Sequence, residues 1–343
     1  MAKVTLFWLK LPIMPKIAFI GFDGCYGYSL TGPQDTFHVS NAHWHKQHTD
    51  AKPPLEWCTV SPNGAPFSTT SGLNVLPDGD LSLAEDCDIV ALSSLFYPGE
   101  KEFTQELKKL NPLIEWLTIK YNQGATITSH CTGTFLLAET GLLDNREATT
   151  SWWLADQFEK RYPTVDLKVE QLITEQDRLI CGGAANSHQL ISLRMVENCM
   201  GTNIASLSAK TLLVDTNEIE QTPYLTLQNQ QQHNDQLVSS AQSWIQRNLK
   251  EKISLEELSQ HLSVSQRTLI RRFKYAIKDT PNSYIQNLRI DTAKKLLESS
   301  GHSVDKIMEQ VGYADISSFS RLFRRKTGLT PKAYRQRFQL IAE

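Results

Sequence analysis

The chain has 343 residues, of which 40% are apolar and 21% charged, and its formal net charge is −2. This length exceeds that of one typical compact domain, and the apolar content is enough to bury a core, so we expect two domains. The net charge conceals an asymmetry: residues 236–343 carry +9 and residues 1–235 carry −11. A polyanionic partner is therefore excluded for all but the C-terminal part.

The six cysteines all lie in the acidic part, without a CxxC pair or paired metal-ligand spacing. This usage predicts a reduced, intracellular protein. The opening residues 1–14 are apolar, but they have no basic cluster before the apolar run and no small-residue cleavage site, and they are too short to span a bilayer. We expect a short extension ahead of Met14, no membrane segment, and a cytoplasmic, nucleoid-associated protein of bacterial type.

Short apolar runs in the first two hundred residues alternate with helical patterns. Pro33 marks a predicted helix start, residues 100–121 read as one amphipathic helix, and Gly141 is a predicted helix stop. Strands that alternate with helices predict a parallel sheet covered on both faces, which is an α/β sandwich. The predicted buried strands are 16–22, 55–61, 87–93 and 125–130.

Beyond a helix-like stretch at 202–214, the chain becomes polar and loses its periodicity. The polar run QNQQQHNDQ is typical of a linker. We therefore predict an α/β domain over residues 15–222, a linker over 223–235 and an all-α domain over 236–343.

The basic region contains an internal repeat. Residues 268–284 (TLIRRFKYAIKDTPNSY) align without gaps with residues 318–334 (SFSRLFRRKTGLTPKAY), and 254–265 matches 303–315 with one residue inserted. Each copy predicts helix, tight turn, helix, and then a Thr-Pro pair that opens another helix, with Thr as N-cap and Pro in the first turn. The repeat therefore predicts two helix-turn-helix units joined by a helix over 281–298, which would hold them at a fixed separation.

The second helix of each unit divides into an apolar and a cationic face. In the first copy Leu269, Phe273, Ala276 and Ile277 share one face, and in the second copy Ile316, Phe319, Leu322 and Phe323 do. The alternative is a charged face that is only solvated, but two matching faces and the one-sided charge favour DNA. Such a helix fits the major groove, where Arg, Ser and Gln can bind base edges and the remaining cations bind phosphates. The predicted DNA-binding residues are Ser265, Gln266, Arg267, Arg271, Arg272, Lys274, Ser317, Ser318, Arg321, Arg324 and Arg325.

Residues 253–274 and 312–338 resemble the AraC-type DNA-binding domain. The pattern GYxDxSxFSRxFRRxTGxTPxxYR is specific to it, and the match covers about residues 236–340. The resemblance implies transcriptional control at a promoter, with two major-groove contacts per subunit and contact with RNA polymerase.

In the first domain, the motif SHCTGTFLLAETGLL (129–143) places Cys131 between a buried strand and a helix start. Small residues two before and two after it give the arrangement of a nucleophile elbow, whose helix dipole would favour a thiolate or a bound anion. A small buried cysteine is the alternative. Chemistry also needs a base, and His130 should point away from Cys131 because neighbouring strand residues alternate sides.

Three stretches, 28–42, 131–153 and 182–201, resemble the DJ-1/PfpI-like domain of GlxA-type AraC regulators. The resemblance spans most of residues 15–222 and implies a flavodoxin-like sandwich related to cysteine amidases and isonitrile hydratases. Two departures stand out: Ser29 replaces the family's acidic residue, and Ser151 replaces its histidine. Since a hydroxyl does not take up and release a proton readily near neutral pH, it cannot replace either group, and we expect no enzyme activity and a vestigial elbow.

An effector pocket is expected at the carboxyl ends of the strands, where open α/β sheets bind ligands. We expect a small-molecule effector, an amino acid or an amine, that alters how a homodimer holds double-stranded DNA, and no cofactor. Active cysteine hydrolase or hydratase chemistry and a thiol redox sensor remain alternatives. No metal is expected, because His43 points away from His45 and His48 on a helix. The predicted pocket residues are Asp23, Ser29, Gly32, Ser94, Leu95, Cys131, Thr132, Ser151 and Trp152, the last of which could cap an apolar or cationic ligand or be ordinary core.

Overall fold

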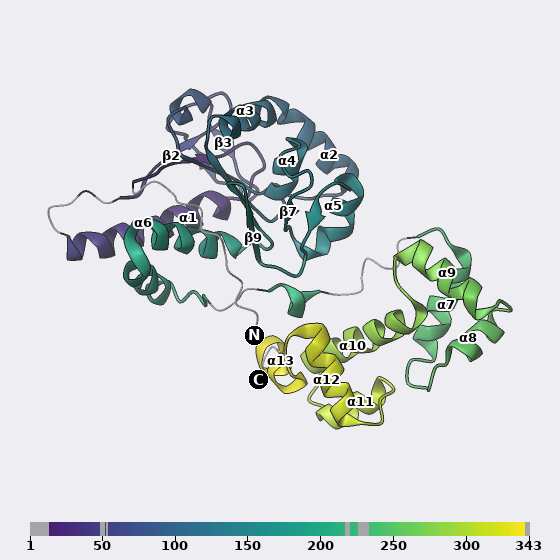
Figure 1. The fold of residues 1–343 in the computed structure, drawn as a ribbon. Coiled ribbons are helices and arrows are strands. Elements are labelled where there is room, and N and C mark those ends of the chain that lie inside the picture. Colours follow the sequence, from purple (N-terminus) through teal and green to yellow (C-terminus); the bar gives the residue numbers. More distant parts are fainter. Residues whose placement is uncertain (1–13, 49–51, 53, 217–219, 226–232, 340–343) are drawn as a thin grey trace. The chain divides into compact units, whose positions relative to one another are not determined.

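The computed structural model describes residues 14–48, 52, 54–216, 220–225 and 233–339 (Figure 1). The chain divides into two compact units, with the boundary between Gln221 and Thr222. The expected N-terminal extension lies, apart from Met14, outside the described residues. So do residues 226–232 of the predicted linker.

The first unit is built on a six-stranded sheet in the order β2-β1-β5-β6-β10-β9. All neighbouring strands are parallel except β10 and β9. The four predicted strands are confirmed. The apolar residues of β1, β5 and β6 are almost all buried, as in a covered parallel sheet, whereas the edge strand β2 is half-buried except at Val60. The strands are β1 (Lys16–Ile20), β2 (Glu56–Val60), β5 (Ile89–Leu92), β6 (Thr126–His130), β9 (Ile173–Gln176) and β10 (Leu179–Gly182).

Helices cover both faces of this sheet (Figure 1). On one face α1 (Tyr28–Gln47) and α6 (Ser187–Thr211) pack against each other, and the other face carries α2 (Glu100–Lys109), α3 (Asn111–Asn122), α4 (Gly133–Glu139) and α5 (Ala155–Arg161). Shorter elements connect them: β3 (Phe67–Ser68), β4 (Asn74–Val75), η1 (Leu81–Ala84), β7 (Glu147–Ala148), η2 (Trp152–Leu154) and β8 (Asp166–Leu167).

Two helix predictions in this unit were wrong in detail. Pro33 lies inside α1, where it removes only one backbone hydrogen bond early in the helix. The predicted helix 100–121 is two helices, because Pro112 in the first turn of α3 cannot continue α2. The predicted helix at 202–214 is confirmed over residues 202–211, the part of α6 that follows its kink at Gly201 (φ 83°). The stop at Gly141 (φ 74°) is confirmed, two residues beyond the end of α4.

The second unit is all helical in its described residues and contains the predicted repeat. The Thr-Pro pairs open α10 and α13 as expected: Thr280 Oγ1 accepts from Ser283 N at 3.2 Å, and Thr330 Oγ1 accepts from Ala333 N at 3.2 Å. The elements are η3 (Thr222–Tyr224), α7 (Gln236–Arg247), α8 (Leu255–His261), α9 (Gln266–Ile277), α10 (Pro281–Ser299), α11 (Val304–Gln310), α12 (Ile316–Thr327) and α13 (Pro331–Phe338).

Two hydrophobic cores support the two helix-turn-helix units, α8–α9 and α11–α12. The first core contains Leu269 and Phe273, and the second contains Phe319 and Phe323. The long helix α10 contributes Ile285 to the first core and Leu297 to the second. Ile316 was predicted to be buried, but its side chain is 39% exposed, because it occupies the first turn of α12 beyond the edge of the core.

Among the described residues of both units, no helix combines the length and the apolar character needed to cross a bilayer.

Candidate DNA interface and effector site

Helix α9 presents a cationic face to solvent. It begins after Ser265, whose hydroxyl accepts a hydrogen bond from Thr268 N at 3.2 Å. Leu269 and Phe273 are completely buried and fix the rotation of the helix about its axis. That rotation leaves the predicted residues Gln266, Arg267, Arg271 and Lys274 exposed.

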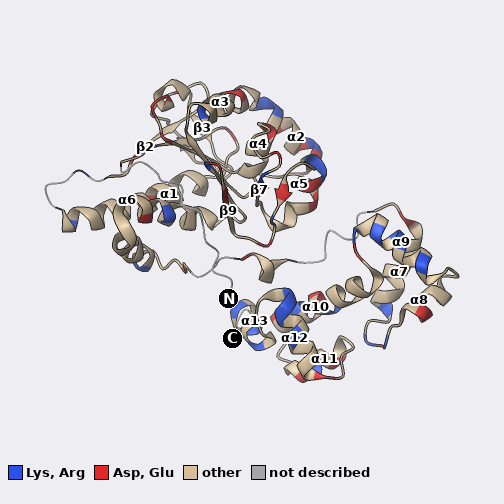
Figure 2. Ribbon diagram, viewed as in Figure 1, with Lys and Arg blue, Asp and Glu red and all other residues tan. Residues whose placement is uncertain are grey.

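Helix α12 repeats this division (Figure 2). Asp315 caps its N-terminus, accepting from Ser318 N at 3.2 Å, and Gly328 ends it in the left-handed conformation, at φ 72°. Phe319 and Phe323 are completely buried. The predicted residues Ser317, Ser318, Arg321, Arg324 and Arg325 are exposed on the other side.

Two of the predicted DNA-binding residues already have a structural partner. The Ser265 hydroxyl caps its own helix, and the Arg272 guanidinium is held by Asp235: Nε donates to Oδ2 at 2.5 Å and Nη2 donates to Oδ1 at 2.8 Å. The hydrogen bonds from Arg272 are the main cause that lowers the pKa of the Asp235 carboxyl. In the repeat alignment Arg272 corresponds to Leu322, which is buried in the second core. Arg272 therefore anchors α9 instead of extending its cationic face.

In the first unit, Cys131 occupies a sharp turn between β6 and α4. Its φ is +54°, in the left-handed region, and its N–H donates to Gly182 O at 2.8 Å. A Cβ at Gly133 would lie 3.0 Å from Ser93 O, so the chain after Cys131 passes very close to the end of β5. The turn places the thiol beyond the carboxyl end of the sheet, where its residue is 6% exposed.

Hydroxyl groups surround this thiol. Ser151 Oγ donates to Cys131 Sγ at 2.9 Å, and Thr150 Oγ1 donates to Cys131 O at 2.8 Å. The Tyr28 hydroxyl also forms hydrogen bonds with Cys131 and with Ser94, and burial is the first cause that raises the Tyr28 pKa. The contacts of the thiol are therefore with groups that stay protonated near neutral pH.

Most of the other predicted pocket residues hold the loops around the turn together. Ser29 Oγ accepts from Ser94 N at 3.1 Å, and Ser94 Oγ donates to His130 O at 2.7 Å. Thr132 Oγ1 accepts from Leu95 N at 2.9 Å and donates to Leu95 O at 2.6 Å. Ser29, Ser94, Leu95 and Thr132 are at most 3% exposed, so they form the floor of the site.

Asp23 and Gly32 make structural contacts away from the Cys131 thiol. Asp23 Oδ1 accepts from Ser68 N at 2.8 Å and holds the β3–β4 hairpin. A Cβ at Gly32 would overlap the ring of His188, so this glycine allows α1 and α6 to approach closely. Trp152 begins η2 directly after Ser151 and is half-buried.

The ring of His130 packs beside residues of α1 and α6. It is 5% exposed, and its ring centroid is 5.6 Å from that of His188 and 6.0 Å from that of Tyr28. Burial lowers the pKa of His130 to about 3, with a smaller contribution from His188, and burial lowers the pKa of His188 to about 4. Both rings are therefore neutral at physiological pH.

Aromatic side chains lie on the loops that follow β1 and β5. Tyr26 packs on Tyr28 with ring centroids 5.1 Å apart and meets the edge of Phe96 at 6.3 Å. Tyr97 meets the edge of Trp153 at 5.7 Å. Phe96 and Trp153 are 51% and 40% exposed, which is high for rings of this size.

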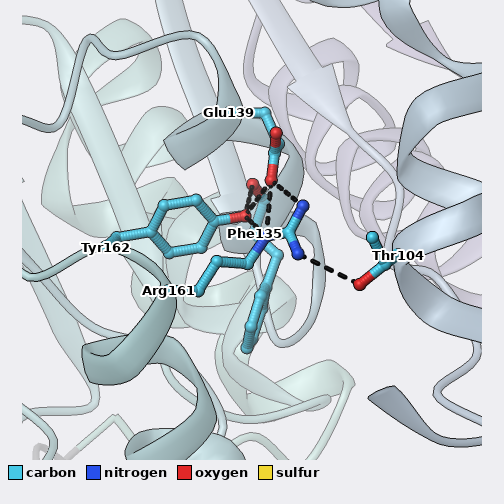
Figure 3. A network of polar contacts seen from close by, with 5 residues as sticks. All are labelled: Thr104, Phe135, Glu139, Arg161 and Tyr162. Atoms are coloured by element: carbon cyan, nitrogen blue, oxygen red, sulfur yellow. Dashed lines mark hydrogen bonds and ion pairs between the residues drawn. The ribbon is translucent and has the colours of Figure 1, made fainter. Parts of the chain in front are cut away.

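A polar network fixes the far end of α4, the helix that starts at the elbow (Figure 3). Glu139 accepts from Tyr162 Oη at 2.5 Å and from Arg161 Nε at 2.7 Å. Arg161 Nη1 donates to Thr104 Oγ1 on α2 at 3.0 Å, and Tyr162 also donates to Phe135 O at 3.2 Å. The helix behind Cys131 is thus tied to α2 and to the end of α5.

Sequence reasoning missed Tyr28, Thr150 and Gln221. Gln221 is 1% exposed, and its side-chain nitrogen donates to Thr150 O at 3.1 Å. Tyr28 and Thr150 each precede a predicted pocket residue in the sequence. This adjacency was the signal that could have identified them. Nothing in the sequence indicates that Gln221, ninety residues after Cys131, supports its turn.

Comparison with known families agrees with this division of the chain. A model of the DJ-1/PfpI family matches residues 15–199, and a helix-turn-helix domain model matches residues 258–337. A crystal structure of a transcriptional regulator protein described as putative, from Vibrio parahaemolyticus, superposes with a TM-score of 0.50 at 22% identity, covering 58% of this chain and 98% of that one. This likeness concerns the fold of the first unit.

Two regulators of Pseudomonas aeruginosa are similar over most of the chain. The HTH-type transcriptional regulator CdhR is 26% identical over 277 residues, which is 80% of each chain. The HTH-type transcriptional regulator GbdR is 24% identical over 283 residues, or 82% of this chain and 74% of GbdR. Both similarities extend across the boundary between the two units.

Proposed function

Since the chain belongs to the DJ-1/PfpI family over its first domain and carries an AraC-type helix-turn-helix domain after it, we propose that it is a transcription regulator that binds a specific DNA sequence under the control of a small molecule. The observation that carries the DNA-binding part is the repeat. Two helices, α9 and α12, each bury aromatic and aliphatic side chains and expose arginines on the opposite face. A helix of this kind inserts into the major groove.

Arg271 and Arg321 occupy equivalent positions of the two copies and are the residues proposed to read bases. Arginine binds the O6 and N7 edge of guanine through two hydrogen bonds, and each such pair contributes about 1–3 kcal/mol of discrimination. Gln266, Arg267, Ser317 and Ser318 complete the proposed base contacts, while Lys274, Arg324 and Arg325 are proposed to bind phosphates. Arg272 is left out, because Asp235 occupies its guanidinium.

Selection of duplexes from a random pool by the full chain tests this assignment. We expect Arg271→Ala and Arg321→Ala each to relax the preference at different base positions of the selected sequence, with a loss of about tenfold to hundredfold in affinity. Lys101→Ala, which removes an exposed cation from the first domain, is the control and should select the same sequence as the wild type. Unchanged sequence preference in both arginine variants would refute the assignment.

The proposed effector site lies at the Cys131 turn. It stands at the carboxyl ends of the central parallel strands, where ligands bind in open α/β sheets. The exposed aromatic rings of Phe96 and Trp153 on neighbouring loops suit an amine or amino acid, since a ring face attracts a cation. We propose binding without turnover, because Ser151 and Tyr28 contact the thiol and neither hydroxyl transfers protons readily near pH 7.

A thermal-shift screen of the full chain with amino acids, amines and quaternary ammonium compounds tests this site. A compound present at a hundred times its Kd should stabilise the protein by about 2.7 kcal/mol, seen as a rise in Tm. Tyr28→Phe, which removes one hydroxyl from the turn, should reduce the rise, whereas Tyr275→Phe in the second unit should not. Hydrolysis of a compound in the screen, lost in Cys131→Ser, would instead make the first domain an enzyme.

The assembly and location of the protein are also proposals. We expect a homodimer in the cytoplasm, with RNA polymerase as the partner at the promoter, and the effector changing the affinity of the dimer for DNA. An effector achieves this only if it binds one arrangement of the protein more tightly than the other.

A further inference from the structure

A small cavity lies between the sheet of the first unit and the helices α1 and α6. Its volume is about 20 Å³, and its walls come from β1, β5 and β6 on one side and from the two helices on the other. Most of the wall is apolar and includes Phe37 and Met195. Polar side chains also line it, among them Ser29 of α1, His130 of β6 and His188 of α6. The cavity therefore reaches the end of the strand from which the elbow turns.

Each of the two histidines has a buried ring nitrogen for which the described part of the chain offers no hydrogen-bond partner. These atoms are His130 Nε2 and His188 Nδ1, on residues that are 5% and 6% exposed. The ring centroids are 5.6 Å apart and the rings are inclined by 60°, without a direct bond between these two nitrogens. Most buried polar atoms in folded proteins have a partner, because leaving one without a hydrogen bond is unfavourable. The two nitrogens therefore call for a partner from outside the chain.

The charge state of the two rings restricts what this partner is. Burial lowers the pKa of His130 to about 3 and that of His188 to about 4, so both rings are neutral near pH 7. A neutral imidazole has one N–H and one bare nitrogen, and the tautomer decides which is which. A cation would suit only bare nitrogens, and an anion would suit only N–H groups. A water molecule both donates and accepts, so it satisfies the pair in any combination of tautomers.

The size of the cavity and its polar lining also fit a single water molecule. A water needs roughly 10–15 Å³ of such space and two to four polar partners. The cavity of about 20 Å³ provides that space, and it is too small for an amine or an amino acid. Ser29 is available as a third partner, because its Oγ accepts from Ser94 N at 3.1 Å and its own hydrogen can be donated into the cavity. The apolar remainder of the wall offers no hydrogen bonds, so the water belongs at the histidine end.

We infer that one water molecule is bound in this cavity and bridges His130 Nε2 and His188 Nδ1, with Ser29 as its third partner. The water joins the last residue of β6 to α6 and α1. Because His130 directly precedes Cys131, this water fixes the strand end from which the elbow turns. The two histidines then form an internal hydration site and take no part in proton transfer to the thiol. The inference goes beyond the proposed function and does not depend on it, since it concerns only the core of the first unit.

A high-resolution crystal structure of the full chain tests the site directly. We expect a peak of electron density at about 2.7–3.2 Å from both His130 Nε2 and His188 Nδ1, as for a hydrogen-bonded water. Three results would overturn the inference: no ordered peak between the rings, a direct bond between the two nitrogens, or a metal ion identified by its anomalous scattering.

Magnetic relaxation dispersion of the solvent tests the site in solution, because it counts long-lived internal water molecules. His130→Leu removes the nitrogen at similar volume and should hold one internal water fewer than the wild type. His130→Gln places an amide near the position of Nε2 and should keep the wild-type number, as should His38→Leu at an exposed position of α1. If His130→Leu fails to fold, His188→Leu against His188→Asn gives the same comparison. An unchanged number of internal waters in the leucine variant would refute the site.

Discussion

His130 and His188 show how a residue beside a candidate nucleophile can serve stability instead of chemistry. Both rings are buried, and their folded-state pKa values, about 3 and about 4, lie below the value of 6.5 for an unperturbed histidine. As the pH falls below 6.5, these histidines become protonated in the unfolded chain but stay neutral in the folded chain. The stability that these neutral rings contribute is complete above pH 6.5 and is lost progressively toward pH 3–4.

Between pH 7.5 and 5, each histidine should therefore lower the free energy of unfolding of the first domain by about 2 kcal/mol. Urea unfolding at the two pH values, followed by tryptophan fluorescence, measures the loss. His130→Gln should reduce it by about half of the combined effect, whereas His38→Gln, at an exposed position of α1, should not change it. A pH dependence that is the same in His130→Gln and the wild type would contradict the burial argument.

At the residue scale, the sequence predicted which residues lie near Cys131 better than it predicted what each of their side chains contacts. Ser29, Ser94, Thr132 and Ser151 do gather around Cys131, because loops after parallel strands meet at one edge of the sheet. The structural role of Asp23 could not be predicted, because its carboxylate accepts a hydrogen bond from the backbone N–H of Ser68, 45 residues away in sequence. Arg272 has the period of a surface cation, and only the fold reveals Asp235 beside it.

The recognition helices α9 and α12 are stabilised by different N-caps, Ser265 and Asp315. Each cap satisfies a backbone N–H that the helix leaves free, so Ser265→Ala and Asp315→Ala should each cost about 1 kcal/mol. Hydrogen-exchange mass spectrometry of the full chain should show about fivefold faster exchange in the affected helix only. Ser317→Ala, one residue into α12, is the matched control, and equal exchange in all three variants would argue against the caps.

At the scale of elements, the apolar periodicity predicted which strands and helices form. It did not predict where a helix breaks or kinks. The strands and the Thr-Pro helix starts follow from local residues and are confirmed. The break between α2 and α3 at Pro112 and the kink of α6 at Gly201 have local signals, but the apolar periodicity continues across both residues and conceals them. Strands β9 and β10 escaped prediction because each has only four residues, and three of the four residues of β9 are polar.

For the whole molecule, the uneven charge determines how binding should depend on salt. The three exposed cations proposed to bind phosphates, Lys274, Arg324 and Arg325, would displace about three counterions. Affinity for the selected duplex should then fall about fortyfold between 50 and 200 mM salt. Filter binding across this range measures the slope, which Arg324→Ala should reduce by about one ion and Lys101→Ala should leave unchanged. A flat salt dependence would mean that these side chains do not face phosphates.

Helix α10 belongs to both cores of the second unit, through Ile285 at one end and Leu297 at the other. Neither helix-turn-helix unit can therefore be removed without leaving an apolar side of the shared helix uncovered. The two copies can differ in their own residues, as at Arg272 and Leu322, but a chain cut down to one copy would expose that apolar side to water.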